Sequence, residues 1–179
     1  MPSELAAETA QLVDDYLQHH LGGSALPATR TAQTLRRVAD ELGSREQPFF
    51  RSACSPAALP EPGGAAAHLS RVAAQMEADG GLNWGRVVAL VVFTGTLAAA
   101  LAERGAPRDE VAALAQALVA YLAGEKREWL EAHGGWDGFY HFFNKHGSDA
   151  TDQNSTISNA IMAAAGFGLA GLAFLLAVR

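Results

Sequence analysis

The sequence predicts an all-α fold, a bundle of seven or eight helices around a hydrophobic central helix, followed by a C-terminal transmembrane tail anchor. Three observations lead to this prediction. Apolar residues recur at intervals of three and four along most of the chain. Residues 87–102 contain no charged side chain, and residues 160–178 are all apolar or glycine. No segment outside 87–102 suggests a β-strand.

Length and composition narrow the class of protein. The chain has 179 residues, of which 49% are hydrophobic, enough for one domain with a substantial core. Its net charge of -6 argues against nucleic-acid binding, which needs a basic surface. The single cysteine, Cys54, cannot form an internal disulfide. The N-terminus lacks the basic and apolar regions of a signal peptide.

The first half of the chain predicts three amphipathic helices. Residues 4–20 carry an apolar stripe, and a second stripe follows the loop at residues 22–29. A Pro/Gly-rich connection at 55–64 precedes a third helix at residues 65–79. The stripes consist of Leu5, Leu12, Val13, Tyr16 and Leu17, then Thr31, Leu35, Val38 and Leu42, then Leu69, Val72, Ala73 and Met76.

The central helix is expected at residues 87–102. Its β-branched residues would suit a strand, but the segment is too long for a typical strand. A helix that is apolar on every side must be enclosed by others. Gly105 ends it, and Pro107 begins the next helix, whose apolar stripe runs from Val111 to Leu122. A short helix at about 125–133, a break at Gly134 and Gly135 and a last helix from Trp136 follow.

The C-terminal run favours a membrane anchor. As a helix, residues 160–178 would span about 29 Å, close to the hydrocarbon thickness of a bilayer. We therefore divide the chain into a helical bundle at 1–147, a polar tether at 148–156 and an anchor at 157–179, with the bundle facing the cytosol. The alternative is a hydrophobic core helix that docks on the bundle.

Three segments together resemble one family, the B-cell lymphoma-2 apoptosis regulators. Asn83-Trp84-Gly85-Arg86, followed by the apolar helix, resembles the first homology region of that family. Residues 128–143, which include Gly-Gly-Trp-Asp-Gly-Phe, resemble the second region, and residues 34–42 resemble the third. The short loop after the first helix is most similar to that of the anti-apoptotic Diva/Boo (Bcl-B) branch.

The resemblance implies a groove that accepts an amphipathic helix from a partner. Arg86 matches the groove arginine that pairs with an aspartate of the ligand helix, and a guanidinium suits a carboxylate because it binds in a planar, bidentate manner. Gly85, which costs about 1 kcal/mol relative to alanine in a helix, would let the foreign helix approach. In the alternative, Arg86 pairs internally, for instance with Asp79, and Gly85 only shapes the turn.

The resemblance also implies a groove lining. Each lining residue could instead belong to an ordinary core, because apolar residues at helical spacing usually do. Asn83 either caps the central helix or bonds the ligand. Trp84 and Trp136 are interpreted as packing anchors. The lining is expected to consist of Val72, Met76, Ala89, Leu90, Phe93, Leu42, Phe50 and Phe143.

The third-region segment also matches the pattern of a ligand helix. Thr31 stands at its first anchor position, where a polar side chain forfeits about 1.5–3 kcal/mol of burial. We therefore expect this helix to pack in its own bundle and to form one wall of the groove. The death-helix motif consists of Leu35, Val38, Ala39, Asp40 and Leu42.

The resemblance implies an anti-apoptotic regulator that holds the death helices of killer ligands or of Bax/Bak-type effectors. It would thereby prevent permeabilisation of the mitochondrial outer membrane, where we expect the chain to be anchored, with the endoplasmic reticulum as a further location. The alternatives are a permeabilising effector of the same fold and a tethered scaffold whose own tail fills the groove. No cofactor, metal or catalytic site is expected, because the histidines are scattered and no nucleophile–base arrangement is recognisable.

Overall fold

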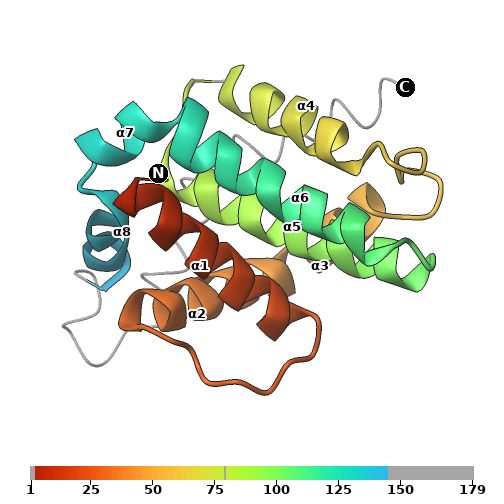
Figure 1. Cartoon of the computed structure of the whole chain (residues 1–179), viewed down its shortest axis with the longest axis horizontal. Helices are drawn as coiled ribbons and strands as arrows, with labels where there is room; N and C mark the ends of the chain where they lie inside the picture. The colour runs from red at the N-terminus through yellow and green to blue at the C-terminus, as the bar shows by residue number, and fades with distance from the viewer. Residues whose placement is uncertain (1–2, 79, 145–179) are drawn as a thin grey trace.

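The computed structural model describes residues 3–78 and 80–144, and over these residues the fold is all-α (Figure 1). The predicted tether and anchor lie outside the described residues. Eight α-helices and one π-helical segment make up the described part. In order they are α1 (Glu4–His20), α2 (Arg30–Arg45), α3 (Gln47–Ala53), α4 (Ala65–Ala78), α5 (Trp84–Glu103), α6 (Arg108–Ala120), η1 (Tyr121–Glu125), α7 (Arg127–Ala132) and α8 (Gly135–Asn144).

Helix α5 is the predicted central helix. It contacts α1, α2, α3, α4 and α6, and Figure 1 shows it running through the middle of the bundle beside α6. By length and composition α5 could cross a membrane, but 78% of its most apolar window is buried inside the protein. The other helices thus provide the apolar surroundings that its composition requires.

Side-chain caps fix where three helices begin. Ser3, Thr29 and Asn83 each precede a helix in extended conformation, and their side-chain oxygens accept backbone hydrogen bonds from residues three positions later. The Asn83 bond, to the nitrogen of Arg86, is 2.8 Å long. Of the two roles considered for Asn83, the structure therefore shows the cap.

The end of the bundle contains a feature that the sequence did not predict. Between α6 and α7 the chain winds into the π-helical segment η1, where we had expected only a continuous stripe and a helix start near residue 125. The break at Gly134 and Gly135 is confirmed, with φ angles of 83° and 61° that favour glycine. Helix α8 begins at Gly135, one residue before the predicted start.

Candidate functional site

The candidate site begins at the turn between α4 and α5. Gly80 and Gly81 adopt φ angles of 113° and 85°, which side chains other than glycine rarely tolerate. This turn ends α4 and brings the chain back so that Asn83 can cap α5. Arg86 therefore lies in the first turn of α5, directly beside the glycine turn.

Arg86 is buried, with only 4% of its surface exposed. Its guanidinium donates a hydrogen bond to the carbonyl oxygen of Gly81. A Cβ atom built on Gly80 would lie 3.9 Å from both Arg86 Nη atoms, so the glycine turn packs closely around the guanidinium. The side chain thus has an internal contact, as the alternative interpretation expected. Its proposed partner, Asp79, lies outside the described residues, so that particular pair stays a prediction.

The predicted lining residues all belong to the hydrophobic core cluster. They come from α2, α4, α5 and α8, which the sequence predicted, and from the short helix α3, for which no apolar stripe was recognised. All are buried, and the most exposed of the lining side chains, Val72, is only 5% exposed. In this conformation the lining residues form core, so a docking helix would reach them only after the surrounding helices move apart. The lining residues in the cluster are Leu42, Phe50, Val72, Met76, Ala89, Leu90, Phe93 and Phe143.

The death-helix motif on α2 packs within its own bundle, as predicted. Leu35, Val38, Ala39 and Leu42 are each at most 1% exposed. The carboxylate of Asp40 is half exposed, and His19 Nε2 of α1 lies 2.9 Å from its Oδ2 atom. The apolar anchors that a ligand helix would present are therefore turned into the core.

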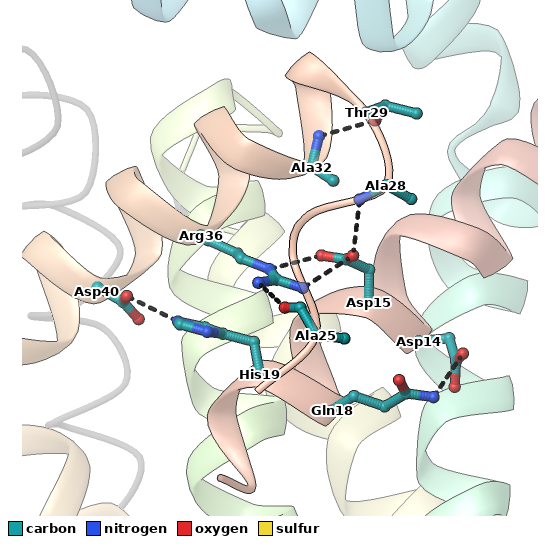
Figure 2. Close-up of polar contacts among 10 residues, drawn as sticks. All are labelled: Asp14, Asp15, Gln18, His19, Ala25, Ala28, Thr29, Ala32, Arg36 and Asp40. Atoms are coloured by element: carbon teal, nitrogen blue, oxygen red, sulfur yellow. Dashed lines mark hydrogen bonds and ion pairs between the residues drawn. The ribbon is translucent and has the colours of Figure 1, made fainter. Parts of the chain in front are cut away.

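A largely buried ion pair between α1 and α2 was not predicted from the sequence (Figure 2). Arg36 donates to both carboxylate oxygens of Asp15, from Nε at 2.8 Å and from Nη2 at 3.0 Å. Its Nη1 atom donates to the carbonyl oxygen of Ala25 at 2.9 Å, and the backbone nitrogen of Ala28 donates to Asp15 at 3.3 Å. The ion pair therefore fixes the α1–α2 loop and links α1 to α2, the helix that carries the death-helix motif.

An aromatic cluster joins the first and second homology segments. The ring of Trp84, which is 6% exposed, packs against Trp129 at 4.9 Å, Phe139 at 5.5 Å and Trp136 at 6.1 Å between centroids. The indole nitrogen of Trp136 donates a buried hydrogen bond of 2.8 Å to Thr9 of α1. Both tryptophans are packing anchors, as interpreted from the sequence, and the cluster fixes the end of the bundle where α5 begins.

The C-terminal end of α4 is tied to η1. Lys126 forms an ion pair with Glu77, and the hydroxyl of Tyr121 donates to the same carboxylate at 3.3 Å. Burial and the neighbouring Glu77 charge raise the pKa of Tyr121, so its hydroxyl stays protonated and can donate. Among the described residues, no group of three or more His, Cys, Asp or Glu side chains is arranged to hold a metal ion.

Comparisons with known proteins find relatives over most of the chain. A family model for apoptosis regulator proteins of the Bcl-2 family matches residues 35–136. The chain is 66% identical to anti-apoptotic protein NR13 of Gallus gallus over 179 residues, covering 100% of both chains. It is 37% identical over 169 residues to Bcl-2-like protein 10 of Homo sapiens, covering 80% of this chain and 78% of that protein.

A solved structure is similar as well. It is the crystal structure of the zebrafish pro-survival protein NRZ in complex with the Bad BH3 segment. It matches with a TM-score of 0.70 and 35% sequence identity, and the match covers 78% of this chain and 94% of that chain.

Proposed function

The chain belongs to the Bcl-2 family of apoptosis regulators, and we propose that it is an anti-apoptotic member that sequesters the death helices of pro-apoptotic relatives. The identity of 66% to a protein named anti-apoptotic NR13 supports the direction of the activity. The likeness to a pro-survival protein in complex with a BH3 segment supports the mode of binding. The activity is binding alone, without catalysis.

The observation that carries this proposal is that Arg86 and the predicted lining residues belong to one buried interior. Arg86 lies beside the glycine turn at the start of α5, and the predicted lining residues from five helices belong to the same hydrophobic core. A helix that inserts there would bury apolar anchors in the cluster and bring an aspartate to Arg86. Because Arg86 is 4% exposed and its Nη1 atom is bonded to Gly81, docking must uncover the guanidinium and exchange part of its internal contacts for the ligand carboxylate.

This exchange predicts a coupling between Arg86 and the ligand aspartate. We expect Arg86→Ala to weaken the binding of a death-helix peptide by about 1–3 kcal/mol, because a charge-assisted hydrogen bond is lost. Calorimetry with the normal peptide and with a peptide carrying asparagine in place of the aspartate completes a double-mutant cycle. Arg71→Ala on α4, which removes an exposed arginine, is the matched control.

Additive effects in that cycle would refute the role of Arg86, even if the variant binds less well for other reasons. The cycle therefore separates direct pairing from any effect that the loss of a buried side chain has on the fold.

A mitochondrial assay tests the direction of the activity. The full chain is added to isolated mitochondria together with a killer-ligand peptide, and released cytochrome c is measured. An anti-apoptotic member lowers the release, and excess peptide that binds the groove restores it. Release above the level seen with the peptide alone would favour the alternative, a permeabilising effector of the same fold.

We further propose that residues 157–179 anchor the chain in the mitochondrial outer membrane, with the endoplasmic reticulum as a second location. The length and apolar composition of this segment support the proposal. After cell fractionation, the full chain should resist alkaline extraction from membranes, and a chain lacking residues 157–179 should be extracted. Full extraction of both would contradict an integral anchor.

A further inference from the structure

A cavity lies beside the predicted ligand groove and shares Phe50 with the groove lining. It has a volume of about 580 Å³ and is bounded by the end of α1, the second half of α2, α3 and the second half of α5. Its α5 wall consists of Val92, Thr96 and Ala99. At about 100° per residue, this face is roughly a third of a turn from the face that carries Arg86 and Phe93. The cavity therefore lies behind the α2–α3 wall of the groove.

The walls of this rear cavity are mainly apolar. Ala39, Phe50, Val92 and Ala99 line it, together with the ring of Tyr16. Gly95 allows the end of α1 to close one side, because a Cβ at this position would come within 2.9 Å of the Tyr16 ring. The volume falls within the range of about 300–1,000 Å³ that is usual for small-molecule sites.

The polar groups of the rear cavity include one carboxylate, that of Asp40, which His19 contacts, and one guanidinium, that of Arg51. Desolvation lowers the pKa of His20, which also contacts the Tyr16 hydroxyl at 3.4 Å, so this imidazole is neutral near pH 7. Arg51 is exposed and, among the described residues, forms no ion pair or side-chain hydrogen bond. Its guanidinium is therefore the charged group of the cavity that is left to pair with a ligand.

We propose that the rear cavity binds a single-chain anionic amphiphile. The alkyl chain would lie on the apolar walls, and the anionic head would pair with Arg51, because a guanidinium binds a carboxylate or a phosphate through two parallel hydrogen bonds. Gln47 and Ser44 also line the cavity and offer additional hydrogen-bond donors. The head can belong to a free fatty acid or to a lysophospholipid with a terminal phosphate, since both present the same chemistry.

Photocrosslinking of the full chain tests the site directly. Long-chain fatty acid and lysophosphatidate probes, each with a photoactivatable group on the alkyl chain, are added below their aggregation concentrations, and crosslinked residues are mapped by mass spectrometry. Crosslinks should fall on the lining residues of α3 and α5, and the head group captured more strongly identifies the source. Crosslinks confined to residues 157–179, or spread evenly over the chain, would overturn the proposal.

Two matched pairs of variants check the chemistry. Arg51→Gln should lower capture about tenfold or more, whereas Arg71→Gln should leave it unchanged. Ala99→Leu fills the cavity and should abolish capture, whereas Ala100→Leu, a half-buried neighbour outside the lining, should not. Equal capture by Arg51→Gln, or equal capture of the fatty acid methyl ester or of an alkylamine probe, would refute an anionic ligand at Arg51.

Discussion

Replacing Gly138 with alanine is expected to destabilise the protein by about 3 kcal/mol or more. A Cβ atom on Gly138 would lie 1.8 Å from the carbonyl oxygen of His133 and 2.9 Å from its carbonyl carbon. Both are backbone atoms, so no side-chain rotation can relieve the overlap. The junction of α7 and α8 must therefore shift, and this would disturb the packing of Trp136 and Phe139 on Trp84.

Gly124→Ala in η1 is the matched control for this prediction. Nothing lies within 4 Å of a Cβ at Gly124, and its φ is not in the positive region. This variant should be neutral or stabilising, because alanine restricts the unfolded chain. Denaturant unfolding followed by far-UV circular dichroism gives both free energies. Equal losses for the two variants would contradict the steric explanation.

The second large effect is expected from Asp15→Ala. This change leaves the guanidinium of Arg36, which is 11% exposed in its side chain, without its carboxylate. Removing one member of a buried ion pair costs about 3–5 kcal/mol, since the remaining charge stays desolvated. The contact of Asp15 with the nitrogen of Ala28 is lost as well, so the α1–α2 loop should become more mobile.

The adjacent residue supplies the control for Asp15. Asp14 is exposed and bonds only Gln18 among the described residues, at 3.1 Å, so Asp14→Ala should cost less than about 0.5 kcal/mol. The double variant Asp15→Ala/Arg36→Met should recover part of the loss, because it removes the unpaired charge. Unfolding free energies of the variants decide between the outcomes. A double variant no more stable than Asp15→Ala would count against the buried-charge explanation.

Much of the fold could be predicted because its signals are local. Apolar stripes identified α1, α2 and α4, and the length of an uncharged run identified α5 in spite of its strand-forming residues. Glycine and proline breaks placed helix ends within a few positions. The segments that resemble the family's three homology regions lie on α2, at the start of α5, and on α7 and α8. These segments pack together in the fold, as their resemblance to one family implies.

The features that could not be predicted depend on distant residues or on conformation. Asp15 and Arg36 are 21 positions apart, and nothing in either local pattern shows that their side chains meet. The π-helical turn η1 adds a register change that a hydrophobic stripe does not reveal. The burial of the groove lining is a property of the conformation, since the same apolar residues can line an open groove or fill a closed core.

The aromatic cluster has a spectroscopic consequence. The chain contains three tryptophans, and Trp84, Trp129 and Trp136 all belong to the same cluster at the start of α5. Intrinsic fluorescence therefore monitors one end of the bundle only. A helix that docks at Arg86, two residues from Trp84, should change the tryptophan emission. A ligand in the rear cavity that neither absorbs nor quenches should leave the emission nearly constant. Intrinsic fluorescence can thus report docking at Arg86 without any label, whether or not the rear cavity is occupied.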